Sequence, residues 1–181
     1  MSMRPPLPGD LDRKQMVDRI LRVNQAGELG AVRIYRGQLA VLGKGKAAPV
    51  IRRMAEQEKT HLETFNRLIG ERRVRPTLLS PLWHVAGFAL GAGTALLGEK
   101  AAMACTVAVE ETIDEHYARQ AEALGDDEPA LKDTILKFRD DEIEHRDIGL
   151  ERGAEQAPAY PVLSAAIRTG CRVAIWLSER V

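Results

Sequence analysis

Apolar residues recur at steps of three and four along most of the chain, which is the spacing of one helix face. This pattern predicts a first long helix from Leu11 to about Leu42 and a last helix from about Val162 to Ser178. A second helix is expected to begin near Pro49 and end at Gly70, and a later one has Pro129 in its first turn, where proline is well tolerated. No run alternates between apolar and polar residues as a strand would, so the sequence predicts an all-α fold.

A different segment interrupts this pattern between Leu82 and Leu97, where no residue carries a formal charge. It contains Gly87 and Gly91 in Gly-x-x-x-Gly spacing, but it is too short for an ordinary transmembrane helix. It can be interpreted as a buried connecting helix, as a re-entrant segment or as an element that lies on a membrane surface. Polarity returns at Glu99 and the helical spacing then continues to Leu124, so we expect one helix to run across this junction.

One spacing occurs twice in the chain: a single glutamate is followed 30 or 32 residues later by a Glu-x-x-His pair. Residues three apart lie on the same face of a helix, and here that face is the apolar stripe. A carboxylate on a core face is costly unless it is paired or coordinates a metal. Two single glutamates and two such pairs are the set with which a four-helix bundle binds two metal ions. The candidate ligands are Glu28, Glu58, His61, Glu110, Glu142 and His145.

These six residues divide into two similar sets. We expect Glu28, Glu58 and His61 to bind one ion, and the other three residues to bind the second. The carboxylates of Glu58 and Glu142 are the best candidates for bridging both ions. Mixed oxygen and imidazole ligation favours iron or manganese, because structural zinc sites are usually closed and rich in cysteine. A structural bundle without metal is disfavoured, because six polar residues would then lie on core faces.

Several residues near these ligands are candidates for supporting roles. His116 and Tyr117 lie near the face of the second single glutamate, and we consider them for proton or electron delivery. Asp114 is a candidate acceptor for the outer ring nitrogen of a ligand histidine. Gly27 and Gly30 flank the first single glutamate, where their low helix propensity indicates the close approach of another backbone, a metal or a ligand. Ordinary helix packing is the alternative interpretation for each of these residues.

Composition narrows the class of protein. The 26 basic and 26 acidic residues are interspersed and cancel, which argues against a nucleic-acid partner. Cys105 and Cys171 lie in apolar stretches without metal or redox spacing, so we expect free, packed thiols in an intracellular protein. Met1 to Asp12 has neither the apolar run of a signal peptide nor the composition of a transit peptide. We expect a single domain over residues 1–181, with an irregular tail at residues 1–10.

Four segments that carry the candidate ligands also resemble a known family. They are Arg22 to Gln38, Glu56 to Phe65, Cys105 to Gln120 and Lys137 to Leu150. In this order, they resemble the Coq7-type demethoxyubiquinone hydroxylases, which are di-iron monooxygenases of ubiquinone biosynthesis. The resemblance implies a ferritin-like four-helix bundle with an extra apolar helical segment and a C-terminal helix, in which the six candidate ligands hold two carboxylate-bridged iron ions. Asn24 and Gln25 stand where the family usually has Asp-His, which weakens the case for a supporting carboxylate at position 24.

The resemblance also implies an activity. One oxygen atom of O₂ would be inserted into a polyprenylated methoxy-benzoquinol, demethoxyubiquinol, with electrons from NADH reaching the centre through the quinone. Because a long isoprenoid tail lies in the bilayer, we expect residues 82–97 and the last helix to dock on a membrane and to form an apolar channel. The protein would be peripheral on the inner membrane, at the cytoplasmic face in a bacterium or the matrix face in a mitochondrion, with other ubiquinone-biosynthesis proteins as partners. A ferritin-like iron store or peroxide scavenger is the alternative, which the uncharged segment disfavours.

Overall fold

The computed structural model describes residues 11–181, and within this range it contains helices and no strand. The elements are α1 (Arg13–Leu42), α2 (Ala48–Glu71), α3 (Ser80–Leu96), α4 (Glu99–Leu124), α5 (Pro129–Glu151), the 3-10 helix η1 (Ala154–Gln156) and α6 (Tyr160–Ser178). The all-α prediction is therefore confirmed. The irregular tail expected at residues 1–10 lies outside the described residues.

Local sequence signals explain where the helices begin. The Asp12 side chain accepts a hydrogen bond from the Gln15 backbone N–H at 2.8 Å, and the Gln15 side chain accepts one from the Asp12 N–H at 3.0 Å. This reciprocal capping box satisfies backbone donors that the first turn of α1 would otherwise leave unpaired. Pro49 and Pro129 stand in the first turns of α2 and α5, as the sequence predicts, and Pro161 does the same in α6. The last helix therefore begins at Tyr160, slightly earlier than expected.

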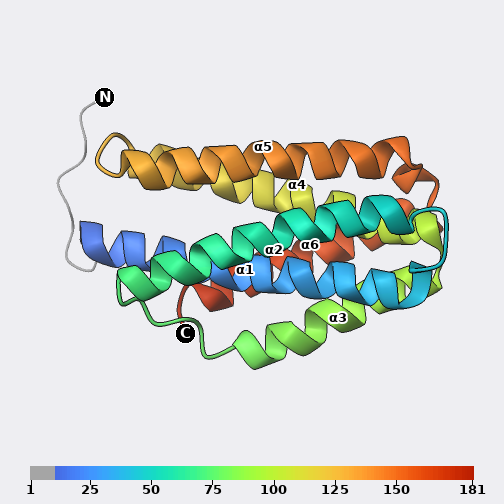
Figure 1. Cartoon of the computed structure of the whole chain (residues 1–181), viewed down its shortest axis with the longest axis horizontal. Helices are drawn as coiled ribbons and strands as arrows, with labels where there is room; N and C mark the ends of the chain where they lie inside the picture. Colours follow the sequence, from blue (N-terminus) through green and yellow to red (C-terminus); the bar gives the residue numbers. More distant parts are fainter. Residues whose placement is uncertain (1–10) are drawn as a thin grey trace.

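Four long helices, α1, α2, α4 and α5, run along one another as a bundle (Figure 1). Short turns join α1 to α2 and α4 to α5, so each of these pairs is antiparallel, and α3 carries the chain back along the bundle against α1. Apolar side chains fill both ends of the interior. Leu21, Phe65 and Ile135 belong to the cluster at one end, and Met54 and Met103 to the cluster at the other. The middle of the bundle, between these clusters, is where the candidate ligands lie.

The expectation of one helix across residues 82–124 is wrong. α3 ends at Leu96, and Gly98 adopts a φ of 110°, a conformation that favours glycine and that turns the chain before α4 begins. The fully buried interpretation of this segment is also wrong, because only one face of α3 packs against α1. A Cβ atom built on Gly91 would lie 2.7 Å from the carbonyl carbon of Ile34 and still closer to its oxygen. The two backbones therefore touch directly at this glycine.

The opposite face of α3 is apolar and exposed. Leu82 and Val85 on α3, and Val173 and Trp176 on α6, each have more than half of their surface exposed. Over residues 11–181, none of the helices combines the length and the apolar character that crossing a bilayer requires. Cys105 and Cys171 are free thiols, as expected, and both pack in the apolar cluster around Ile167.

Candidate metal centre

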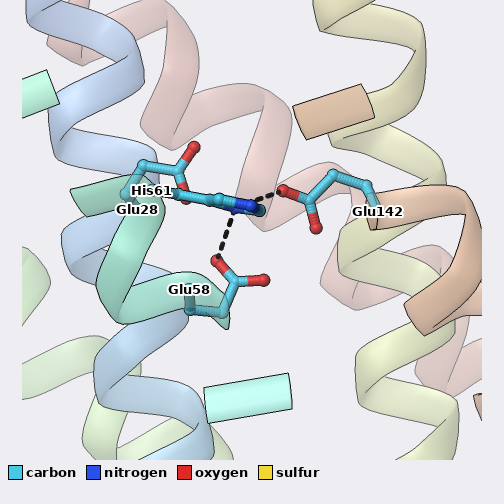
Figure 2. A group of neighbouring side chains, drawn as sticks. All are labelled: Glu28, Glu58, His61 and Glu142. Atoms are coloured by element: carbon cyan, nitrogen blue, oxygen red, sulfur yellow. Dashed lines mark ion pairs between the residues drawn. The ribbon is translucent and has the colours of Figure 1, made fainter. Parts of the chain in front are cut away.

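The six candidate ligands meet in the middle of the bundle, and each has at most 3% of its surface exposed. Glu28, Glu58, His61 and Glu142 form one group and Glu58, Glu110, Glu142 and His145 form a second, with the potential ligand atoms of each group all within 4.8 Å of one another. Figure 2 shows the first group, in which the His61 ring lies between carboxylates from α1, α2 and α5. Glu58 and Glu142 belong to both groups, the arrangement that bridging carboxylates need.

The inner nitrogens of the two histidines face these carboxylates. His61 Nδ1 lies 3.3 Å from Glu142 Oε1 and 3.7 Å from Glu28 Oε2. His145 Nδ1 lies 3.1 Å from Glu58 Oε1 and 3.3 Å from Glu142 Oε2. Despite these short distances, neither Nδ1 atom nor either Glu58 oxygen has a hydrogen-bond partner among residues 11–181. Buried polar atoms without partners are costly, so their convergence indicates a site built for a cation.

The outer nitrogen of each histidine is held by a side chain from the opposite half of the bundle. His61 Nε2 lies 3.0 Å from Asp141 Oδ2 on α5, and His145 Nε2 lies 3.2 Å from Gln57 Oε1 on α2. Both partners accept hydrogen bonds, so each imidazole donates from Nε2, and Nδ1 is the nitrogen that faces the centre and could bind a metal there. Asp141 and Gln57 each stand one residue before a shared glutamate. That repeat is the sequence signal by which they could have been found.

The role expected for Asp114 is wrong. Its Oδ1 atom accepts a hydrogen bond from Arg139 Nε at 2.5 Å, and it does not contact either ligand histidine. Asp114 is on α4, whereas His61 and His145 are supported by side chains on α5 and α2. The supporting acceptors therefore come from across the bundle and not from the helix turn that follows a ligand.

Two buried tyrosines make an equivalent pair of hydrogen bonds to the two single glutamates. Tyr117 donates its hydroxyl proton to Glu28 Oε1, and Tyr35 donates to Glu110 Oε1 at 2.9 Å. Each tyrosine stands seven residues after one single glutamate and contacts the other. Burial and then the nearby carboxylates raise the pKa of both tyrosines well above the usual value, so they stay protonated and donate. The sequence reading identified Tyr117 and missed Tyr35, although the seven-residue spacing is common to both.

The electrostatics of the cluster favour positive charge. Burial opposes protonation of the histidines, yet the adjacent carboxylates raise the pKa of His61 to about 12 and that of His145 to about 10. Burial and the charge of Glu142 raise the pKa of Glu110 to about 8, and the same causes raise that of Glu58. Metal binding requires ionised carboxylates and neutral imidazoles, and in that state the six residues would have a formal charge that two divalent cations cancel. The donor set and the charge therefore both fit two metal ions.

A polar network lies at one side of this cluster. Asn24 and Gln120 exchange two amide hydrogen bonds, each of 2.8 Å, between α1 and α4. Gln120 Nε2 is also 2.7 Å from His116 Nε2 and donates to it. Burial, and then the charges of Arg119 and Arg19, lower the pKa of His116 to about 4, so this imidazole is neutral near pH 7. Asn24 therefore pairs with an amide side chain of α4.

An apolar cavity of about 540 Å³ lies beside the cluster, between α1, α3, α4 and α6. The cavity opens to the surface between α3 and α6, at the exposed small residues Ala86, Ala166 and Gly170. The Cα atoms of these two helices are more than 8 Å apart. Trp83 Nε1 on α3 donates a hydrogen bond of 2.9 Å to Ser178 Oγ on α6 at this cavity. A second pocket, of about 30 Å³, is lined by the glutamates of the cluster together with His116 and Tyr117.

Comparisons with known proteins agree with this geometry. Residues 15–178 match the family described as "Ubiquinone biosynthesis protein COQ7". A relative in Rhodospirillum rubrum named 3-demethoxyubiquinol 3-hydroxylase is 66% identical over 97% of this chain and 83% of its own. The human NADPH-dependent 3-demethoxyubiquinone 3-hydroxylase, mitochondrial, is 60% identical over 91% of this chain and 78% of its own. The Saccharomyces cerevisiae 5-demethoxyubiquinone hydroxylase, mitochondrial, is 45% identical, again over 91% of this chain and 78% of its own. With the family matched over most of its length, the chain belongs to the COQ7 family of ubiquinone biosynthesis proteins.

Proposed function

We propose that this protein is a 3-demethoxyubiquinol 3-hydroxylase, a monooxygenase that inserts one oxygen atom of O₂ into the ring of a prenylated quinol. The observation that carries this proposal is a buried cluster of four glutamates and two histidines beside a large apolar cavity. The names of the relatives support the same reaction. They favour it over the alternative of a ferritin-like iron store, because the relatives are named hydroxylases.

Two iron ions are the metals proposed for this cluster. Glu28 and His61 would serve one ion and Glu110 and His145 the other, with Glu58 and Glu142 shared between them. When bound, two ferrous ions supply electrons for the activation of O₂. The chain supplies the rest: hydrogen bonds at Nε2 fix the orientation of each imidazole, and burial in the bundle keeps bulk water out.

Tyr117 and His116 are proposed to deliver protons or electrons to the pocket, which both residues line. Tyr117 holds its proton at Oη against Glu28 Oε1, at the edge of the cluster. His116 is neutral and accepts a hydrogen bond from Gln120 at Nε2, so it keeps a proton on Nδ1. These two groups are the ionisable side chains of the pocket that lie outside the proposed ligand set, which supports the assignment.

The apolar cavity is proposed to hold the ring and the first part of the isoprenoid tail. Its volume lies within the range that binds small ligands, and its lining is almost entirely apolar. Leu82, Val85, Val173 and Trp176 lie on the two helices that border its opening, so the tail would leave the cavity beside an exposed apolar surface. We propose that this surface docks on the inner membrane. Flotation of the protein with liposomes would be expected, and recovery of all the protein in the unbound fraction, with and without substrate, would contradict docking.

The test of the reaction uses protein reconstituted anaerobically with ferrous iron, a short-tailed demethoxyquinone, a reduced nicotinamide nucleotide and ¹⁸O₂. Mass spectrometry is expected to find one ¹⁸O atom in a hydroxylated ring. NADH is the donor proposed from the resemblance, whereas the human relative is named NADPH-dependent, so both nucleotides are compared. Iron uptake without any hydroxylated product from either nucleotide would favour the storage alternative. Other ubiquinone-biosynthesis proteins remain proposed partners.

The ligand assignment is tested by Glu142→Ala, which removes a carboxylate shared by both groups. We expect turnover to be lost while far-UV circular dichroism is unchanged, because helical packing of α5 does not depend on this carboxylate. Glu144→Ala is the matched control, because Glu144 lies two residues away on the same helix, its side chain is 51% exposed, and it pairs with the exposed Arg53. Substantial hydroxylation by Glu142→Ala would refute the assignment.

A further inference from the structure

The large apolar cavity and the small carboxylate pocket share a ring of lining residues, which we call the junction. They are Val23, Gly27, Ala31, Val109, Ile113 and Ile175. Three of them lie on α1 at steps of four, two lie on α4 with the same spacing, and one lies on α6. Gly27 and Val109 stand directly before Glu28 and Glu110 in the sequence. The junction is therefore where the apolar cavity comes nearest to the proposed metal ligands.

Gly27 is the one member of the junction without a side chain. No atom of the described residues lies within 4 Å of a Cβ atom built on it. A Cβ on Gly87, at the contact of α3 with α1, would instead lie 2.8 Å from the carbonyl oxygen of Gly30. Glycine favours a helix less than alanine does, so its presence inside α1 needs another reason. Packing therefore does not require glycine at position 27, and the space beside it is open.

The open space beside Gly27 lies between two cavities of very different volume. The large cavity has about 540 Å³, but the pocket at the glutamates has about 30 Å³, room for roughly two water-sized molecules. A benzoquinol ring fits the first and not the second. Glu58 lines the small pocket; it is 1% exposed, and neither of its carboxylate oxygens has a hydrogen-bond partner in the part of the chain that the structure describes. A ligand that acts at this pocket must therefore present an edge to it from the large cavity, across the junction.

We infer that Gly27 is a specificity-determining residue that leaves open the passage between the two cavities. The edge of the quinol ring reaches the carboxylate pocket through this passage, while the ring body and the tail stay in the apolar cavity. A side chain at position 27 would occupy the passage and hold the ring back from the pocket. This inference rests on the proposed hydroxylase function for the identity of the ring.

The first test compares stability with turnover. Gly27→Ala is expected to raise the melting temperature by about 2–4 °C, because alanine favours the helix and meets no neighbour. It is also expected to lower kcat/KM about ten-fold, and Gly27→Val about 100-fold, because the ring is held away from its reacting position. Gly93→Ala is the matched control, since Gly93 lies inside α3, lines neither cavity, and a Cβ there also meets no described atom within 4 Å. It should gain the same stability and keep wild-type turnover.

The second test does not depend on turnover. A catechol with a two-unit isoprenoid tail is added to the iron-loaded, oxidised protein, and its charge-transfer absorbance reports whether the ring reaches iron. We expect the band in the wild type and in Gly93→Ala, and its loss in Gly27→Val. Azide is an anion of only three atoms, so it should still give its own absorbance band with the iron-loaded Gly27→Val protein. That band would show that the metal centre of the variant is intact.

The outcomes separate this inference from the reaction on which it rests. Gly27→Val protein with a wild-type catechol band and wild-type turnover would overturn the passage, and so would a wild type without any catechol band. A wild type that gives the band, loses it in Gly27→Val and yet hydroxylates no quinol would support the passage and count against the proposed reaction.

Discussion

Replacement of Gly91 by alanine tests how closely α3 must lie on α1. The added Cβ would be 2.7 Å from the carbonyl carbon of Ile34, which falls 0.7 Å short of the 3.4 Å where ordinary contact begins. The obstacle is helix backbone and cannot rotate away, so α3 must move outward. Overpacking of this kind costs about 1–3 kcal/mol, and the better helix propensity of alanine returns about 1 kcal/mol. The oxygen of Ile34 is closer still, so we expect the upper end of the range and a net loss of about 2 kcal/mol.

Gly93→Ala is the control, because Gly93 is exposed on the same helix and a Cβ there meets no atom of residues 11–181 within 4 Å. It should gain about 0.5–1 kcal/mol from propensity alone. Urea unfolding followed by circular dichroism measures both free energies, and thermal melts should show Gly91→Ala lower by about 4–8 °C and Gly93→Ala higher by about 1–4 °C. Equal stabilisation of the two variants would refute the direct backbone contact between α3 and α1.

Three further predictions follow from the site and its supports. Asp141→Asn should weaken ferrous iron binding about 10–100-fold in anaerobic titrations, because Asp141 orients His61. Asp140→Asn changes an exposed residue and should bind iron like the wild type. Equal affinities of the two variants would contradict the orienting role. Arg72 holds the pKa of Glu128 below its usual value through hydrogen bonds of 2.9 and 2.8 Å, so the pair stabilises the fold above the unfolded pKa of about 4.3 and loses this contribution as pH falls through the folded pKa. Arg72→Met should therefore cost about 0.5–1 kcal/mol at pH 7 and progressively less below pH 4, and a difference that grows in acid would refute the pairing. Removal of iron with a chelator should lower the melting temperature by about 5–10 °C, as expected for a ligand held at about 100 times its Kd, and an unchanged melt would argue against binding at the cluster.

The helices and the convergence of the six candidate ligands follow from the sequence, because both depend on periodicity along one chain. Glu58 and His61 lie three residues apart on an apolar stripe, and this pattern predicts a buried pair whatever the details of packing. The side chains that support the histidines could not be predicted in the same way. Asp141 meets His61 across the bundle, so the contact depends on the relative position of two helices that no local pattern describes. The break at Gly98 was missed because apolar spacing is the same on both sides of it, and only the backbone conformation separates α3 from α4.

The two halves of the chain exchange contacts at the metal centre, and each half contributes the same kinds of residue. The hairpin of α1 and α2 supplies a single glutamate, a Glu-x-x-His pair, a tyrosine and a histidine support, and the hairpin of α4 and α5 supplies the same set. Because Tyr35, Tyr117, Gln57 and Asp141 each act on a ligand of the other hairpin, neither hairpin can prepare its own ligands. Each hairpin therefore gives the other the same kinds of contact that it receives. In this respect the centre resembles the interface of a homodimer, although both halves belong to one chain. Bound metal would link the two hairpins and stabilise their contact.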